Sequence, residues 1–396
     1  MFPQMRVLNV VGSLDQRSGG PLSAVLNLSA ICAPLGLYSE ILGFGPISIP
    51  DNPLASELVQ SLPLGTPTSY GYSPALRRWC RNNLRKFDVV ILHGLWMYPN
   101  WGVSRECINA RIPYIVFPHG MLDLWSVHEQ GVLKLMKKRV YWHWRERTVI
   151  EDCHAVFFTT RRELQNAMLT LTLPPCTKLV VNPYGVKRRD STLPVEPSAK
   201  VDQGLRLKIA LFLGRIHPKK RPDLLIQAWR NAEVGPEWKL VIAGSGDRSY
   251  ISTLMRLVRK LNLDDAVQFA GNVAGTDKQY LFQRASWFLL PSEQDNFGIA
   301  VIEAVQAGCA IAISDQVYLS DELPAGSEVL PVRLGAWSDF MRKRMPDETW
   351  QATQARRVAG ALLQQFDHEK VAKGWIDAIE ESIRQKPAAI ADVTTA

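Results

Sequence analysis

The sequence predicts an α/β protein made of two doubly wound domains in tandem. Short apolar runs rich in β-branched residues alternate with longer helical patterns, which is typical of parallel strands joined by crossover helices. The alternation lapses over residues 185–204, which contain two prolines, mixed charges and no apolar period, and it then restarts. A length of 396 residues suits two domains better than one or three.

In the first half, apolar runs predict six strands with helices between several of them. The strands are expected at residues 6–11, 38–42, 89–92, 114–117, 155–159 and 179–181. One helix is expected to begin at Pro21, because proline is favourable at the first helical position and Leu22 and Val25 share a face. A second, long helix is expected over residues 131–150.

The second half repeats the pattern. Strands are expected at residues 208–213, 238–243, 267–270, 287–290 and 310–313. Helices are expected from Pro222, over the stretch that carries Leu254 and Val258, and over residues 356–384. We therefore predict a first domain over 1–186, a linker over 187–207, a second domain over 208–360, a final helix over 361–385 able to cross back to the first domain, and a tail over 386–396. Two open sheets in tandem place a cleft between them, lined by the carboxyl ends of the strands.

Composition excludes several classes of protein. Hydrophobic residues make up 46% of the chain and charged residues 21%, which excludes a disordered chain. No apolar run reaches the ~18 residues that span a bilayer, and no signal peptide is recognisable, so we expect a cytoplasmic protein. The six scattered cysteines indicate reduced thiols, with no metal-ligating cluster. A net charge of +8 suits phosphate-bearing ligands, anionic membranes or nucleic acid alike.

A basic loop follows the expected strand at 208–213. It reads GRIHPKKRP, and a glycine at its start, Gly214, lets the backbone approach a ligand. Arg215 and Lys220 then precede a helix N-terminus, an arrangement suited to a diphosphate. The alternative is an ordinary solvated loop.

An acidic pair follows the expected strand at 287–290, in the run PSEQDNFGIAVIEA. If a helix begins near Phe297, Asp295 or Asn296 can cap it. Glu303 then lies roughly 9 Å along the helix axis from its start. A ligand along that helix would meet one acid at each end, which fits a sugar, a diphosphate and a ribose in a row. The alternative is a surface helix with solvated acids.

Taken together, these runs resemble a known family. FLGRIHPKKRPDLLIQAW, LVIAGSGD and LLPSEQDNFGIAVIEAVQAGCAIAIS are similar to the C-terminal half of the group 1 (family 4) glycosyltransferases of the GT-B fold. Gly19-Gly20-Pro21 resembles the family's glycine loop. HGLWMYPNW, PHGMLDLW and KKRVYWHWRERTVIEDCHAVFFTTRRE resemble members that build bacterial surface polysaccharides.

The resemblance implies roles for individual residues. Arg215 and Lys220 would neutralise the donor diphosphate, and Glu303 would accept hydrogen bonds from the ribose. Asp295 would lie beside the transferred sugar and His119 near the reacting carbon. The backbone near Gly214 would also contact the donor. The backbone N–H groups of Asn296, Phe297 and Gly298 would bind the hydroxyls of the transferred sugar. Gly19 and Gly20 would let the first domain close on phosphate and acceptor.

Two positions depart from the family pattern. Asp295 replaces a glutamate, so its carboxylate is one methylene shorter. Tyr184 stands in NPYGV where the family usually carries an asparagine. His93 also follows an expected strand, and either a structural or a ligand-binding role is open for it.

The resemblance implies transfer of a sugar from a nucleotide donor to a hydroxyl of a glycan acceptor that is expected to be lipid-linked. It also implies retention of the anomeric configuration and no need for a metal or other cofactor. Such enzymes build exopolysaccharide or lipopolysaccharide. An epimerase or hydrolase of nucleotide sugars on the same fold is one alternative. A basic nucleic-acid-binding protein is another, although the cations are dispersed and no nucleic-acid motif is present.

The expected helix over 131–150 interleaves cations with aromatic residues, and Trp125 lies just upstream. Its cations and aromatics are Lys134, Lys137, Lys138, Arg139, Arg145, Arg147, Tyr141, Trp142 and Trp144. This pattern suits a helix resting on an anionic membrane, on the inner face of the cytoplasmic membrane. A solvated helix with its aromatics in the core is the equal alternative.

Overall fold

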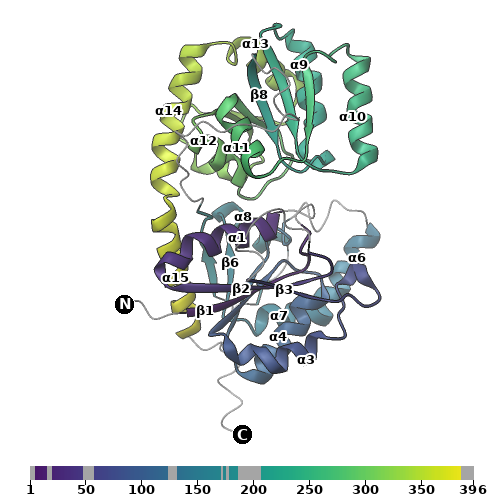
Figure 1. Cartoon of the computed structure of the whole chain (residues 1–396), viewed down its shortest axis with the longest axis vertical. Coiled ribbons are helices and arrows are strands. Elements are labelled where there is room, and N and C mark those ends of the chain that lie inside the picture. Colours follow the sequence, from purple (N-terminus) through teal and green to yellow (C-terminus); the bar gives the residue numbers. More distant parts are fainter. Residues whose placement is uncertain are drawn as a thin grey trace. The chain divides into compact units, whose positions relative to one another are not determined.

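The computed structural model describes residues 5–15, 20–47, 58–123, 132–170, 173–174, 178–185 and 207–384. The chain divides into two compact units, Met1–Lys187 with His368–Ala396, and Arg188–Asp367. Each unit is a parallel β-sheet flanked by helices (Figure 1). Outside the described residues lie Gly19, Trp125, Cys176, the expected linker up to residue 206, and the expected tail.

Within the described part of the first unit, seven parallel strands run in the order β3-β2-β1-β4-β5-β6-β7. They are β1 (Met5–Val11), β2 (Leu37–Phe44), β3 (Val59–Leu62), β4 (Val89–His93), β5 (Tyr114–Phe117), β6 (Ala155–Phe158) and β7 (Leu179–Val181). The six expected strands are all present. The sequence missed β3, a four-residue edge strand whose two middle residues are exposed, because so short a run shows no periodicity.

The helices of the first unit cover both faces of this sheet. They are α1 (Gly20–Cys32), α3 (Leu76–Asn83), α4 (Tyr98–Ala110), α6 (Val132–Tyr141), the π-helical turn η5 (Trp142–Glu146), α7 (Arg147–Glu151), α8 (Arg161–Thr170) and α15 (His368–Arg384). The prediction of one continuous helix over 131–150 is therefore wrong, because the π-helical turn η5 interrupts it between α6 and α7. The π turn widens the helix where Trp142 and Glu146 both point into the core.

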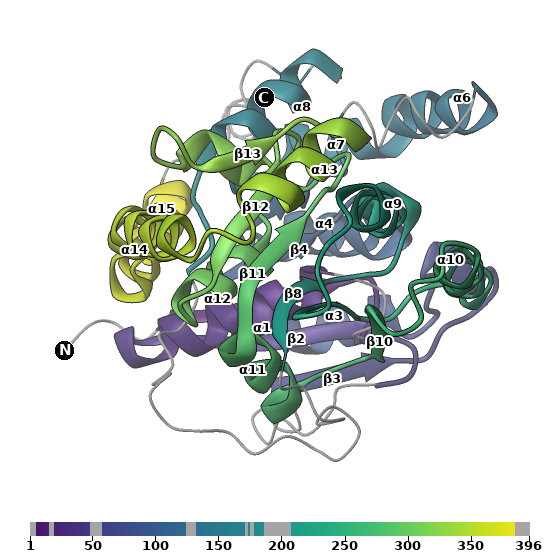
Figure 2. The same cartoon turned by 90° about the horizontal axis from the view of Figure 1, so that it is seen from above.

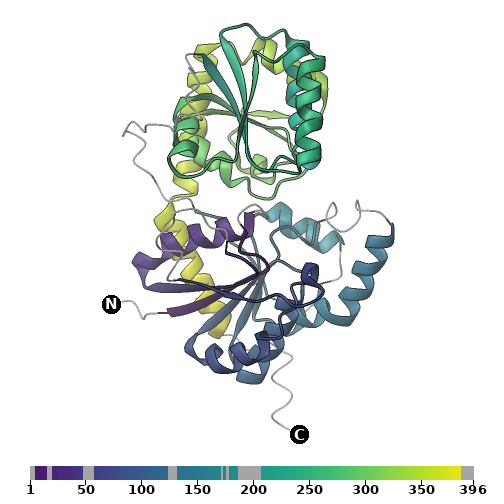
Figure 3. The ribbon, with the colours of Figure 1, turned by 45° about the vertical axis from the view of Figure 1, so that its right-hand side comes forward.

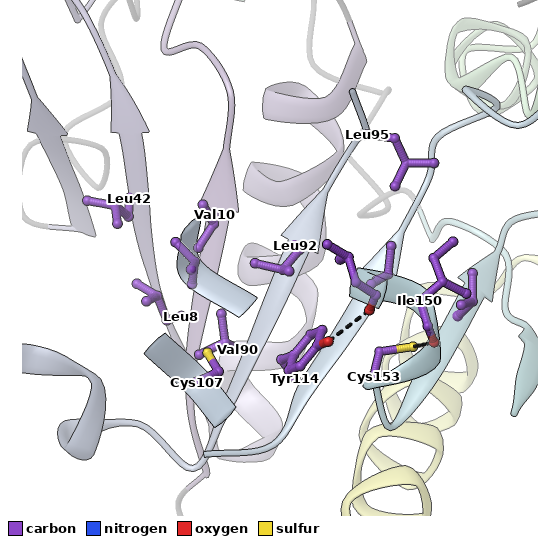
Figure 4. Packing of buried hydrophobic residues seen from close by; sticks show 14 of the residues in the cluster. Leu8, Val10, Leu42, Val90, Leu92, Leu95, Cys107, Tyr114, Ile150 and Cys153 are labelled. Carbon is purple, nitrogen blue, oxygen red and sulfur yellow. Dashed lines mark hydrogen bonds between the residues drawn. The ribbon is translucent and has the colours of Figure 1, made fainter. Parts of the chain in front are cut away.

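A buried hydrophobic cluster lies between the first sheet, α4 and α7 (Figure 4). Val90 and Leu92 of β4, Cys107 of α4 and Ile150 of α7 all contribute buried side chains to this cluster. The hydroxyl of Tyr114 donates to the carbonyl oxygen of Val149 at 2.8 Å, so its one polar group is paired inside the core. Each such buried Leu or Val stabilises the unit by about 1.5–3 kcal/mol.

In the second unit, six parallel strands run in the order β10-β9-β8-β11-β12-β13 among the described residues. Figure 3 shows this sheet with helices on either side of it. They are β8 (Lys208–Leu213), β9 (Trp238–Ala243), β10 (Val267–Gly271), β11 (Ala285–Leu290), β12 (Ala310–Ser314) and β13 (Glu328–Leu330). The sequence missed β13, a three-residue, half-buried edge strand. The two sheets confirm the predicted α/β class with two doubly wound domains.

Helices cover both faces of the second sheet. They are α9 (Pro222–Ala232), α10 (Arg248–Lys260), α11 (Gly275–Arg284), α12 (Ile299–Gln306), α13 (Leu334–Lys343) and α14 (Glu348–Gln365). The helices α9, α10 and α13 lie on one face, and α11, α12 and α14 lie on the other (Figure 2). The single helix expected over 356–384 is wrong, since α14 ends at Gln365 and α15 begins at His368. At the break, Phe366 turns inward and its ring contacts that of Phe297.

Strand order reverses direction at one point in each sheet, between β1 and β4 and between β8 and β11. Open α/β sheets bind ligands outside the carboxyl ends of the strands at such a switch point. The loops that follow β8 and β11 contain the basic and acidic runs singled out from the sequence. In the first unit, His93 is the last residue of β4 and Gly94 begins the loop after it.

Candidate active site

The loop after β8 begins with a close backbone contact. A Cβ added to Gly244, which follows β9, would lie 1.8 Å from the carbonyl oxygen of Gly214. Gly244 also has φ of 138°, a conformation that other residues rarely adopt. Next to it, the N–H of Ile216 donates to the carbonyl of Ser245 at 2.8 Å, and the Ile216 side chain is buried. These contacts fix the loops after β8 and β9 against each other.

The cations of the β8 loop have different environments. Arg215 is exposed and forms no ion pair with the residues that the structure describes. Lys220 ends the short helix η6 (Pro218–Lys220), and its ammonium donates to Oδ2 of Asp295. Arg221 pairs with Glu293 at 2.7 Å and with Asp223 at 3.2 Å. The basic run is therefore tied to the β11 loop and is not simply solvated.

His217 caps η6 within the same loop. Its Nδ1 accepts from the backbone N–H of Lys219 at 3.2 Å, which requires an unprotonated nitrogen. Partial burial lowers the pKa of His217, and the charges of Arg215, Lys219 and Lys220 lower it further. The imidazole is therefore neutral at physiological pH and adds no charge to the loop.

Asp295 is held by an extended segment. Its N–H donates to the carbonyl of Gln316 at 3.1 Å, and its own carbonyl accepts from Tyr318 at 2.9 Å. Its side chain is 21% exposed and that of Lys220 is 17% exposed. The pair is thus partly shielded from water, at the edge where β8 and β11 end.

The expectation that Asp295 or Asn296 caps a helix beginning near Phe297 is wrong. The helix α12 starts at Ile299, its N-cap is Gly298 with φ of 65°, and no side chain caps it. The amide oxygen of Asn296 accepts from Gln294 at 2.8 Å instead. A left-handed glycine turns the chain sharply into α12, so the acid before it points to Lys220 and not to the helix end.

Phe297 and Glu303 have different environments in this segment. Phe297 is buried, with its ring 5.2 Å from that of Phe366, so its side chain belongs to the core. Glu303 lies on the less buried face of α12, and its Oε1 accepts from Nζ of Lys278 at 2.7 Å. Lys278 is on α11, and no sequence pattern marked it.

At the corresponding edge of the first unit, two histidines meet. His119 lies two residues after the end of β5, in a left-handed conformation with φ of 52°, and its Nε2 lies 2.8 Å from Nδ1 of His93. His93 Nε2 contacts Oδ1 of Asn9 at 2.9 Å, and His119 Nδ1 contacts the hydroxyl of Tyr184 at 2.6 Å. Both ring nitrogens of His119 are therefore bonded within the unit. No sequence pattern indicated the contacts with Asn9 and Tyr184.

A buried carboxylate supports the turn that carries His119. Glu163 of α8 accepts from the N–H of Gly120 at 2.6 Å and from the N–H and hydroxyl of Thr159 at 2.8 and 2.7 Å. Burial raises the pKa of Glu163, and these hydrogen bonds oppose the rise. Gly20, by contrast, is the first residue of α1.

The basic aromatic segment has one exposed side. Met136, Val140 and Trp144 are 61%, 67% and 66% exposed. The guanidinium of Arg145 lies 4.0 Å from the ring centre of Trp101 and 4.2 Å from that of Trp144. Trp142 is buried, so the aromatic residues divide between core and surface.

Two features are absent from the part of the chain that the structure describes. Among the described residues, no group of three or more His, Cys, Asp and Glu side chains is arranged to hold a metal ion. None of the helices described has the length and apolar character that crossing a membrane requires.

Comparisons with known proteins agree with the fold. Residues 198–324 match the model of "Glycosyl transferases group 1", and residues 19–185 match that of a "Glycosyl transferase 4-like domain". The mannosylfructose-phosphate synthase of Agrobacterium fabrum is 26% identical over 274 residues, covering 60% of this chain and 57% of that protein. The GDP-mannose:cellobiosyl-diphosphopolyprenol alpha-mannosyltransferase of Xanthomonas oryzae is 26% identical over 306 residues, or 76% of each chain.

Among solved structures, HepE of Anabaena in complex with UDP and glucose superposes with a TM-score of 0.73 at 16% identity, covering 95% of this chain and 100% of that one. The chain spans about half the length of the first curated relatives it matches, between 43% and 58%. The two matched models together span most of both units. The chain belongs to the group 1 (family 4) glycosyltransferases of the GT-B fold.

Proposed function

We propose that this glycosyltransferase moves a hexose from a nucleoside-diphosphate sugar to a hydroxyl of a lipid-linked glycan, with retention of the anomeric configuration. The observation that carries the proposal is the meeting of the β8 and β11 loops, where Lys220 pairs with Asp295 beside the exposed Arg215. This edge offers two cations and one carboxylate at the switch point of the sheet. A diphosphate joined to a sugar needs both kinds of group.

The cations account for departure of the nucleotide. A bound diphosphate would give the Lys220 ammonium a second anionic partner, and Arg215 would add a planar set of donors. Both charges would stabilise the negative charge that develops on the leaving phosphate. We propose that they supply what a divalent cation supplies in other transferases, so that no metal is required.

The remaining donor contacts extend along α12. We propose that the Asp295 carboxylate accepts from sugar hydroxyls, and that the backbone N–H groups of Asn296, Phe297 and Gly298 bind the same sugar. The Glu303 carboxylate would accept from the ribose hydroxyls, with its orientation held by Lys278. His119 would lie near the reacting carbon.

Named relatives support the classes of donor and acceptor. HepE is seen with UDP and glucose, and the Xanthomonas enzyme is named for GDP-mannose and a diphosphopolyprenol acceptor. We therefore propose a uridine or guanosine diphosphate hexose as donor and a polyprenol-linked glycan as acceptor. The product would be a surface polysaccharide, either an exopolysaccharide or part of a lipopolysaccharide.

Purified protein incubated with UDP-glucose or GDP-mannose and a polyprenol-linked glycan tests the reaction. We expect the glycan to gain one hexose, and the anomeric proton coupling of the product, measured by NMR, to match that of the donor. Product of inverted configuration would overturn retention. Epimerisation or hydrolysis of the donor with no glycosylated product would overturn transfer itself.

The acceptor suggests how the protein is localised. Met136, Val140 and Trp144 are exposed at four-residue spacing along α6 and η5, with Lys137, Arg139 and Arg147 also exposed on this segment. Apolar side chains beside cations suit the surface of an anionic bilayer. We propose that this segment binds the inner face of the cytoplasmic membrane, where the lipid-linked glycan would be reached.

Vesicle sedimentation tests the membrane contact. The protein should sediment with phosphatidylglycerol vesicles and not with phosphatidylcholine vesicles. Replacing Met136 and Trp144 by serine should reduce this binding about tenfold or more, because each loses buried apolar area. The control Met255→Ser, at a 40% exposed residue of α10, should bind like the unaltered protein. Equal binding by all variants would contradict the proposal.

A further inference from the structure

Tyr184 reaches a residue that a shorter side chain could not. It follows β7 and is 5% exposed, and its hydroxyl lies 2.6 Å from Nδ1 of His119. The two rings are nearly parallel, with an angle of 11° between their planes. An asparagine, which the family usually carries here, ends several bonds short of that nitrogen. The tyrosine therefore adds a contact specific to this chain.

The position of Tyr184 is itself held by the last helix. Nε1 of Trp375, on α15, donates to the carbonyl oxygen of Pro183 at 2.7 Å. The ring of Phe117 lies 5.4 Å from that of Trp375, 5.6 Å from that of Tyr184 and 4.1 Å from that of His119. This aromatic packing leaves the tyrosine and the histidine little freedom to rotate apart.

The hydrogen bonds form a chain with one direction. Oδ1 of Asn9 can only accept, so Nε2 of His93 carries the proton at that 2.9 Å contact. A neutral His93 then accepts at Nδ1, which makes Nε2 of His119 the donor across 2.8 Å. A neutral His119 in turn accepts at Nδ1, from the hydroxyl of Tyr184. Each ring nitrogen in the chain has a partner.

The surroundings keep both imidazoles neutral. Burial lowers the pKa of His119 to about 3 and that of His93 well below its ordinary value. The titratable groups that face this chain are Tyr184 after β7, Glu163 on α8 and, next to Glu163, Asp123 after β5. Burial, followed by the Glu163 charge, raises the pKa of Tyr184, so its hydroxyl keeps its proton.

We infer that Tyr184 is a positioning residue of the sugar-transfer site, whose hydroxyl holds His119 as an uncharged imidazole protonated at Nε2. The inference rests on the proposed function, in which His119 lies near the reacting carbon. Glycosyl transfer develops positive charge on the sugar ring in the transition state. An imidazolium beside that carbon would repel this charge, and a donor bonded to Nδ1 opposes its formation. With both nitrogens occupied, the ring of His119 serves as a fixed neutral group and not as a proton carrier.

The experiment compares Tyr184→Phe with Tyr114→Phe in the full chain. Both changes delete one buried tyrosine hydroxyl and keep the ring, but Tyr114 donates to Val149 in the core. Histidine labelled with ¹⁵N reports the tautomer and titration of His119, assigned with the His119→Gln variant. Transfer kinetics with the nucleotide sugar provide kcat and KM separately.

We expect the Nε2–H tautomer in the unaltered protein. Tyr184→Phe should raise the proton affinity of His119 about tenfold, because the loss of one hydrogen bond changes an equilibrium by roughly that factor. The neutral His119 of this variant should then populate both tautomers. The substitution should lower kcat about tenfold with less than a twofold change in the donor KM. Tyr114→Phe should reduce stability and change none of these. A His119 protonated at Nδ1, or a Tyr184→Phe protein with unaltered His119 signals, would overturn the inference.

The spectroscopic readout separates this inference from the proposed function. If no sugar is transferred by any variant while the tautomer responds as expected, the proposed reaction is wrong and Tyr184 still fixes His119. If transfer proceeds normally in Tyr184→Phe and the signals are unchanged, the reaction stands and the positioning role is wrong.

Discussion

The ammonium of Lys220 donates to Oδ2 of Asp295 across 75 positions of sequence, joining the loop after β8 to the loop after β11. Both side chains are mostly shielded from solvent. Water screens the attraction between two such shielded charges less than it does at an open surface. Removal of one partner therefore leaves the other charge uncompensated. The place of this ion pair at the switch point of the second sheet makes it the first target for substitution.

Lys220→Ala should lower kcat/KM for the donor about 100-fold or more, because removal of one preorganised charge from a leaving group costs that much in comparable sites. The same variant should bind UDP or GDP more weakly in calorimetry. Lys260→Ala, at an exposed residue near the end of α10, is the matched control and should leave both quantities unchanged. Normal turnover by Lys220→Ala would contradict the proposal that this residue binds the donor diphosphate.

Asp295→Asn should separate nucleotide binding from transfer. Loss of the carboxylate frees the Lys220 ammonium, so the affinity for UDP or GDP should rise or stay constant. Transfer should fall, because the amide is a weaker acceptor for sugar hydroxyls than a carboxylate. Asp295→Glu should retain both activities in part, since the charge remains. If Asp295→Asn loses nucleotide affinity and transfer in equal measure, the acid acts on the phosphate side.

Glu303→Gln should weaken binding of UDP or GDP about tenfold or more, because a charged acceptor of hydroxyl groups is lost. Binding of inorganic pyrophosphate, which has no ribose, should be unaffected. Calorimetry with both ligands on one protein preparation provides the comparison. An equal loss for pyrophosphate would show that Glu303 acts through its Lys278 pair on the phosphate and not on a ribose.

Gly244→Ala should destabilise the second unit strongly. The added Cβ would overlap the carbonyl oxygen of Gly214 at 1.8 Å, and neither backbone segment can move without breaking strand contacts. Gly360→Ala is the control, because Gly360 lies inside α14 with open space around it. That change should stabilise the protein by about 0.5–1 kcal/mol through helix propensity. Thermal unfolding of both variants distinguishes close backbone contact from a general effect of alanine.

Deprotonation of the buried Glu146 carboxyl should lower the free energy of unfolding of the protein as pH rises. Burial raises the pKa of Glu146 from 4.5 to about 7, opposed by the hydrogen bond that its Oε1 accepts from the N–H of Trp96. Between those values the folded state holds more protons than the unfolded state, so the free energy of unfolding falls by about 3 kcal/mol and then levels off. Glu146→Gln does not titrate and should lack this fall.

Urea unfolding at pH 5 and pH 8 measures the effect of Glu146. Glu151→Gln, at a partly exposed partner of Arg147, should change stability by less than about 1 kcal/mol at either pH. A wild-type protein that loses no stability relative to Glu146→Gln over this range would contradict the expectation.

Local patterns located most strands, because fully buried parallel strands are short continuous apolar runs bounded by turn residues. The exceptions, β3 and β13, are short edge strands whose residues are only partly buried. Helix ends were less predictable. A π turn divided one expected helix, and an inward-turned Phe366 divided another, because tertiary burial and not helical period set those breaks.

The sequence by itself determined the two α/β domains, and it determined that a basic loop and an acidic loop both follow strands of the second domain. These features depend on periodicity, glycine and charge within a few residues. Only the tertiary structure decided that Lys220 meets Asp295, that Lys278 meets Glu303, and that Asn9, His93, His119 and Tyr184 form one hydrogen-bonded chain. Such contacts join residues from different strands and helices, and their geometry follows from strand order and side-chain length, which no local pattern encodes.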